Sequence, residues 1–132
     1  MADQPSAGGG RTILVADDDP QILALISRQL ARLGYRVLEA ADGAEALASA
    51  RAQKPDLIVL DVLMPHLSGW EVAREVRRDP ALKNTPIVVL TAIGHAVSDA
   101  TSPLFADAFL DKPFEFADLE SKIAQVLAKH HD

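Results

Sequence analysis

The chain has 132 residues, enough for one domain with a buried core, and its composition excludes several classes of protein. Apolar residues make up 48% of it, but no apolar run approaches the roughly 18 residues that a membrane span needs. The net charge of −6, with no Lys/Arg cluster, argues against binding of nucleic acid or an anionic membrane through this chain, because phosphate groups need a cationic surface.

The two ends of the chain are expected to be tails. Residues 1–10, MADQPSAGGG, lack the basic start and apolar centre of a secretory signal and are rich in the small residues of flexible segments. The chain has no cysteine, so nothing suggests an oxidising compartment. We therefore expect a cytoplasmic protein with a domain at 11–129 and a short tail at 130–132.

Short apolar runs alternate with amphipathic stretches from Arg11 onward, and five such pairs fill the chain. This order predicts an α/β domain with a parallel sheet and helices on both faces. The expected strands cover residues 12–16, 36–39, 56–60, 86–90 and 108–110.

The first helix is expected directly after the strand at 12–16. Asp19 fits the N-cap, Pro20 fits the first helical position, and Gly34 ends the helix. The apolar face of this helix is predicted to hold residues at helical spacing, namely Ile22, Leu25, Ile26, Leu30 and Leu33.

The later helices have their own start signals. Asp42 and Glu45 have the spacing of a capping box, as do Ser68 and Glu71. Pro55 closes the helix that begins after Asp42, and the last helix is expected from about residue 115. The segment 93–105 is the hardest to assign, because a helix starting near 95–101 would be broken or shortened by a proline at 103.

Chemically useful residues follow the predicted strands. In an open parallel sheet, ligands bind beyond the carboxyl ends of the strands. The residues at these positions are Asp17, Asp18 and Asp19 after the first strand, Asp61 after the third, Thr91 and Ala92 after the fourth, and Lys112 after the fifth. Acids, a hydroxyl and one amine are therefore expected to meet at one edge of the sheet.

The acids at this edge need more positive charge than Lys112 supplies. Asp17, Asp18 and Asp61 would bring about three negative charges together, and a hard divalent ion such as Mg²⁺ prefers oxygen ligands of this kind. Asp19 is left to cap the helix. Asp61 would then be placed to act as a carboxylate nucleophile that receives a phosphoryl group, with its charge balanced by the metal and by Lys112.

Five features together resemble the receiver domains of two-component response regulators, of which CheY is a single-domain member. They are the motifs ILVADDDP, PDLIVLDVLMP, PIVVLTA and DKPF, and the spaced Gly69, in the family's order. The resemblance runs from Arg11 to about Lys129. It implies a flavodoxin-like, doubly wound five-stranded sheet in the order 2-1-3-4-5 with five helices, the fourth of them, within 93–105, short or irregular.

The resemblance also implies the roles of the acidic site. Asp61 would be the phosphoacceptor, and Mg²⁺ would be bound by Asp17, Asp18, Asp61 and the backbone carbonyl of Leu63. Lys112 would contact the phosphoryl group and precede a cis peptide bond to Pro113.

A second group of residues is implied to form the switch. Thr91, followed by Ala92, would move toward the phosphoryl group, and Phe109 would turn inward. A partner would read this change on the surface formed by residues 93–105, the last strand and the last helix. The stretch SPLFADAF departs from the usual family pattern there, which puts that output surface in question.

Leu63 and Ile93 occupy the two positions that in the family influence water attack on the aspartyl phosphate. Both are apolar, so neither side chain can orient a water molecule. We expect a long-lived phosphorylated state.

The expected function is a signalling switch that accepts a phosphoryl group from a histidine kinase or phosphotransfer protein and catalyses only its own phosphorylation and dephosphorylation. One alternative is a phosphorylation-independent adaptor built on the same fold. A Mg²⁺-dependent phosphohydrolase of the haloacid-dehalogenase type is disfavoured, because Leu63 stands where that family needs a second acid. A nucleotide-binding domain is disfavoured by the lack of a G-x-G-x-x-G turn or a P-loop.

Overall fold

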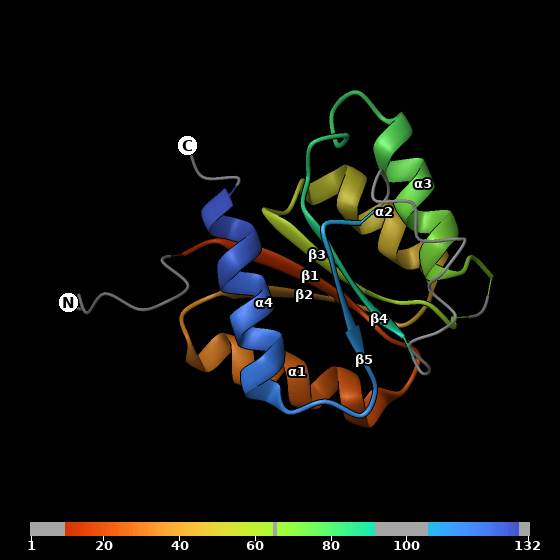
Figure 1. Ribbon diagram of the computed structural model, residues 1–132. Coiled ribbons are helices and arrows are strands. Elements are labelled where there is room, and N and C mark those ends of the chain that lie inside the picture. Colours follow the sequence, from red (N-terminus) through yellow and green to blue (C-terminus); the bar gives the residue numbers. More distant parts are fainter. Residues whose placement is uncertain (1–9, 65, 92–105, 130–132) are drawn as a thin grey trace.

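Five parallel strands form one sheet in the computed structural model, which describes residues 10–64, 66–91 and 106–129 (Figure 1). The strands are β1 (Thr12–Ala16), β2 (Arg36–Ala40), β3 (Leu57–Asp61), β4 (Ile87–Thr91) and β5 (Ala108–Asp111). Their order across the sheet is β2-β1-β3-β4-β5. This is the flavodoxin-like order, so the predicted fold class is confirmed.

The helices lie on both faces of the sheet, as the alternating pattern predicts. They are α1 (Pro20–Arg32), α2 (Gly43–Gln53), α3 (Gly69–Arg78) and α4 (Phe116–Lys129). In Figure 1, α1 and α4 cover one face, whereas α2 and α3 cover the other. The part of the chain that the structure describes holds these four helices, and the further helix expected within 93–105 falls outside it.

The predicted helix starts are largely confirmed. Asp19 caps α1, and its carboxylate accepts hydrogen bonds from the amides of Gln21 and Ile22. Ser68 and Glu71 form the predicted capping box at the start of α3. The box at α2 is only half formed.

At α2, the Asp42 carboxylate accepts from the Glu45 amide, as the capping-box spacing predicts. The Glu45 carboxylate, however, accepts from the amide of Ala41, one residue before the expected partner, at 2.6 Å. The amide of Ala41 precedes the helix and lies outside its ladder of backbone hydrogen bonds. The Glu45 carboxylate therefore fixes the residue that follows β2 instead of completing the capping box.

The core has two apolar layers, because successive residues of a strand point to opposite faces. In β1, Ile13 and Val15 pack with α1 and α4, whereas Leu14 and Ala16 pack with α2 and α3. The interior strands β3 and β4 are buried along their whole length. Their last residues, Asp61 and Thr91, are therefore buried at the ends of fully buried strands.

The predicted apolar face of α1 is wrong at one position. Leu25 is 51% exposed, whereas Leu23, which the prediction left out, is buried with Ile26 and Leu30. The buried stripe runs along the side of α1 that meets β1 and α4, and Leu25 lies beyond its edge. The α1 surface near the site is therefore more apolar than the sequence predicts.

The described helices include none that is both long and apolar enough to cross a bilayer; α4 has 14 residues.

Candidate functional site

Two buried aspartates lie at the carboxyl ends of adjacent strands. Asp17 follows β1, and Asp61 is the last residue of β3; both are almost fully shielded from solvent. Because β1 and β3 are hydrogen-bonded neighbours, these ends meet at one edge of the sheet. The predicted convergence of the two acids is confirmed.

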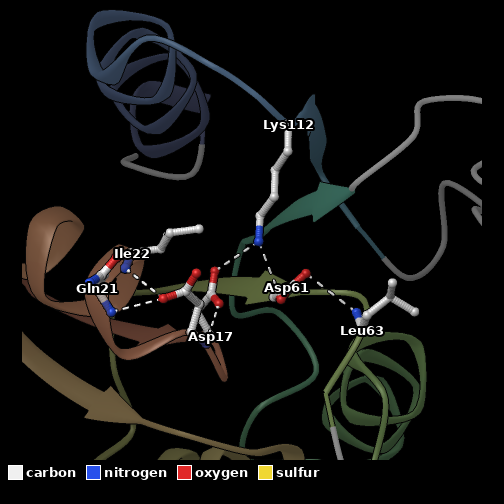
Figure 2. A network of polar contacts seen from close by, with 7 residues as sticks. Asp17, Gln21, Ile22, Asp61, Leu63 and Lys112 are labelled. Atoms are coloured by element: carbon white, nitrogen blue, oxygen red, sulfur yellow. Dashed lines mark hydrogen bonds and ion pairs between the residues drawn. The ribbon is translucent and has the colours of Figure 1, made fainter.

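Lys112 reaches over both aspartates from the loop after β5 (Figure 2). Its Nζ lies 3.0 Å from Oδ2 of Asp17 and 3.3 Å from Oδ2 of Asp61. The cis peptide bond to Pro113, which the resemblance implies, is present. One ammonium group therefore bridges two carboxylates that come from different strands.

Asp18 and Asp19 lie in different surroundings, and the predicted cap at Asp19 is confirmed. Asp18 is exposed, and one oxygen each of Asp17, Asp18 and Asp61 lie within 4.8 Å of one another. Asp19 caps α1, and its amide donates to Oδ1 of Asp17 at 2.9 Å. Three carboxylates thus face one lysine, and this all-oxygen donor set fits a hard divalent cation such as Mg²⁺.

The charge imbalance is visible in the acidity of Asp61. Burial, followed by the negative charge of Asp17, raises the pKa of Asp61 from 3.8 to about 6, against the opposing effect of Lys112. Burial would lower the pKa of Lys112, but its hydrogen bond to Asp17 and the charges of both aspartates outweigh this and raise it. Lys112 therefore stays charged, but one ammonium group among three carboxylates leaves the site with excess negative charge.

Leu63 contacts the site through its backbone. Its amide donates to Oδ1 of Asp61 at 3.3 Å, as Figure 2 shows. Leu63 is 65% exposed, although Asp61 beneath its amide is buried. Leu63 therefore donates a backbone hydrogen bond to Asp61, while its apolar side chain is exposed to solvent.

Thr91 lies at the end of β4 and is 1% exposed. Its hydroxyl donates to Oδ1 of Asp111, the residue opposite it on β5, at 3.1 Å. The amide of Lys112 donates to the carbonyl of Thr91 at 2.6 Å. The hydroxyl of Thr91, the predicted switch residue, is thus hydrogen-bonded to β5, the strand that directly precedes Lys112.

Phe109 lies on β5 and packs against the apolar layer of α2 and α3. Its ring centroid is 6.1 Å from that of Trp70 in the first turn of α3, with an interplanar angle of 51°. Both side chains are partly buried. The aromatic pair therefore connects β5 to the helix that follows the Asp61 loop.

Residues 13–124 match the family model of the response regulator receiver domain. The chain belongs to this family. The match lies inside the predicted domain at 11–129 and confirms the resemblance found in the sequence. Receiver domains act in two-component signalling.

Named relatives of this receiver domain agree with the match. It is 38% identical over 120 residues to the alkaline phosphatase synthesis transcriptional regulatory protein PhoP of Bacillus subtilis, covering 90% of this chain and 49% of PhoP. The chain thus spans about half the length of the curated relatives that it matches.

Solved structures agree as well. The response regulator TrrA of Thermotoga maritima, solved in complex with Mg(2+)-BeF, is 39% identical with a TM-score of 0.80, over 88% of this chain and 98% of TrrA. The chemotaxis response regulator CheY4 of Vibrio cholerae is 35% identical with a TM-score of 0.83, over 89% and 98% of the two chains.

Several predicted features of this receiver domain lie outside the described residues. They are residues 1–9 of the tail expected at 1–10, Ala92, Ile93, the helix within 93–105 and the tail at 130–132. Their roles stay predictions.

The sequence pattern assigned no role to Asp111 or Gly43, and Gly69 was used only as a family feature, without its contact to Asp61. Asp111 is part of the DKPF motif. Gly43 and Gly69 start α2 and α3, and a Cβ at either would overlap a backbone carbonyl, of Leu67 and Asp61 respectively. A glycine at the first position of a helix is a weak signal for such close approach.

An apolar hollow of about 420 Å³ borders Lys112 of the receiver domain. It is lined by Ile22, Leu25, Ile26, Lys112, Pro113 and Phe114. The unexpected exposure of Leu25 opens this hollow between α1 and the loop after β5.

Proposed function

We propose that this receiver domain is a phosphorylation-dependent signalling switch with Asp61 as the phosphoacceptor. The observation that carries the proposal is the bridging position of Lys112, within 3.3 Å of both Asp17 and Asp61. This arrangement presents the Asp61 carboxylate beside a positive charge at the carboxyl ends of the strands. The proposed location of the switch is the cytoplasm.

The phosphoryl donor in this proposal is a histidine kinase or a histidine phosphotransfer protein. An oxygen of Asp61 attacks the phosphorus atom, a new P–O bond forms, and the P–N bond to the donor histidine breaks. Asp61 must be ionised for this step, because a protonated carboxylic acid is a weak nucleophile. Lys112 stabilises the negative charge on the transferring phosphoryl oxygens.

Asp17, Asp18, Asp61 and the backbone carbonyl of Leu63 are the proposed Mg²⁺ ligands. When bound, Mg²⁺ supplies positive charge to the phosphoryl oxygens. The raised pKa of Asp61 supports this assignment, since the site without a cation disfavours the ionised acid. The exposure of Asp18 supports it too, because an exposed carboxylate can bind an ion without a large desolvation cost.

Output is proposed to come from binding of a partner, following movement of Thr91 and Phe109. Thr91, with Ala92 beside it, would donate to a phosphoryl oxygen, and Phe109 would turn toward the space that Thr91 leaves. The packing of Phe109 against Trp70 supports a link between this movement and α3. Nucleic acid is not the proposed partner of this chain, given its net charge of −6.

The phosphorylated state is proposed to be long-lived because Leu63 and Ile93 cannot orient a water molecule. The exposed side chain of Leu63 supports this, since it presents only carbon to the solvent side of Asp61. In Leu63→Asn an amide could hold the water, so faster dephosphorylation is expected. Equal decay rates in wild type and this variant would contradict the assignment of Leu63.

The proposed function is tested by incubating the protein with Mg²⁺ and acetyl phosphate and following its intact mass. Wild type should gain one phosphoryl group, Asp61→Asn should gain none, and the decay of the adduct measures its lifetime. No gain in wild type, under conditions where Mg²⁺ binds, would favour the phosphorylation-independent adaptor.

A further inference from the structure

The side chain of Asp111 holds the hydroxyl of Thr91 in this structure. Thr91 is almost completely buried, and its Oγ1 donates to Oδ1 of Asp111 at 3.1 Å. The two residues are register partners on β4 and β5. The bond therefore joins the proposed switch residue to the residue directly before Lys112.

This hydrogen bond competes with the one that the switch needs. A threonine hydroxyl has one proton and can donate one hydrogen bond. While Thr91 donates to Asp111, it cannot donate to a phosphoryl oxygen on Asp61. The two bonds therefore belong to two different states of the protein.

The backbone cannot separate Thr91 from Asp111 easily. The amide of Lys112 donates to the Thr91 carbonyl at 2.6 Å, and the strands pair along Val88–Thr91 and Ala108–Asp111. Release of the hydroxyl thus comes from side-chain rotation, which on the Thr91 side is rotation about its Cα–Cβ bond. Threonine is β-branched and occupies few staggered rotamers, so this rotation is a step between discrete positions.

We propose that Asp111 is a positioning residue that retains the Thr91 hydroxyl in the unphosphorylated state and so opposes activation of the switch. The inference rests on the proposed function, because the competing bond is to the phosphoryl group of Asp61. A hydrogen bond to a charged acceptor is stronger than one between neutral groups, which makes the carboxylate an effective restraint.

The first test measures binding of beryllofluoride, a phosphoryl mimic, by calorimetric titration in saturating Mg²⁺. Asp111→Ala removes the acceptor, so its dissociation constant should fall by up to about tenfold relative to wild type. Asp111→Asn removes the charge but keeps an acceptor oxygen, so its dissociation constant should fall by less. Thermal melting of each variant checks that it is folded.

A double-mutant cycle distinguishes the hydrogen bond from other effects of Asp111. In a Thr91→Val background, Asp111→Ala should leave beryllofluoride affinity unchanged, because the restrained hydroxyl is already absent. The inference is overturned if Asp111→Ala has no effect in the wild-type background, or the same effect in both backgrounds. Equal tightening by Asp111→Ala and Asp111→Asn would also overturn it, since charge would then be the cause.

A second measurement separates this inference from the proposed function. In the unliganded protein, NMR scalar couplings to the Thr91 γ-methyl carbon report its rotamer. Wild type should show one rotamer and Asp111→Ala an average of several. If wild type failed to bind beryllofluoride, the proposed function would fail. The couplings would still decide whether Asp111 fixes the Thr91 rotamer. An unchanged rotamer in Asp111→Ala would overturn the inference about Asp111.

Discussion

The Cα atom of Gly69 faces the backbone carbonyl of Asp61 so closely that a Cβ atom there would overlap its oxygen. The Gly69 amide also donates to the carbonyl of Val62 at 2.9 Å. The first residue of α3 is thereby fixed against the strand end that carries the proposed phosphoacceptor. The position of Asp61 therefore depends on a residue that has no side chain.

Gly69→Ala should displace the end of β3 and destabilise the domain. Overpacking of this kind costs about 1–3 kcal/mol in the free energy of unfolding, measured by urea denaturation. Phosphorylation by acetyl phosphate should also slow, because the Asp61 carboxylate shifts relative to Lys112. Gly43→Ala is the matched control, since its Cβ would meet the Leu67 carbonyl instead. It should lose stability with a smaller effect on phosphorylation; the reverse ranking of the two variants would contradict the prediction.

Asp61→Asn should stabilise the metal-free protein at neutral pH. The folded-state pKa of Asp61, about 6, exceeds the ordinary value of 3.8, so folding favours the protonated acid. Its contribution to stability, of the order of 1–3 kcal/mol, is fully present below pH 4 and is lost as the pH rises from 4 through about 6. Asparagine carries no such charge.

The measurement for this variant is urea denaturation of wild type and Asp61→Asn between pH 4 and pH 8 with a chelator present. The difference in unfolding free energy should grow as the pH rises from 4 to about 6 and then level off. A difference that is constant across this range would show that the ionisation of Asp61 is not its cause.

Mg²⁺ should raise the thermal stability of wild type, and the exposed Asp18 allows this to be tested without disturbing the core. A ligand present at a hundred times its dissociation constant stabilises a protein by about 2.7 kcal/mol. Asp18→Asn should melt like wild type in chelator but show a much smaller gain with Mg²⁺. Asp56→Asn, which alters a carboxylate near Thr12, is a control that should keep the full gain. An undiminished gain in Asp18→Asn would remove Asp18 from the ligand set.

Trp70 should report the movement of Phe109. It is the only tryptophan of the chain, and its ring lies 6.1 Å from that of Phe109 between centroids. Addition of beryllofluoride with Mg²⁺ should change its fluorescence emission, because the neighbouring ring turns away. In Phe109→Leu the change should be much smaller at equal occupancy of the site. An identical change in both proteins would place its origin elsewhere.

The sequence by itself determined the strands and helices, and it determined which charged and polar groups lie at the carboxyl ends of the strands. Apolar runs bounded by caps such as Asp19 and Ser68 are local signals, and they predicted every described strand and helix to within a few residues. Since parallel strands all end at the same edge, the order of the elements was enough to predict that Asp17, Asp61 and Lys112 lie at that edge.

The tertiary structure decided which of these groups touch and which surfaces stay exposed. The Lys112 amine meets Asp17 across 95 residues of sequence, and the Thr91 hydroxyl meets Asp111 across 20. The exposure of Leu25 likewise depends on how α1 sits on the sheet. Such contacts are fixed by strand register and by the packing of whole layers, whose energies are summed over many distant residues, and no local pattern encodes them.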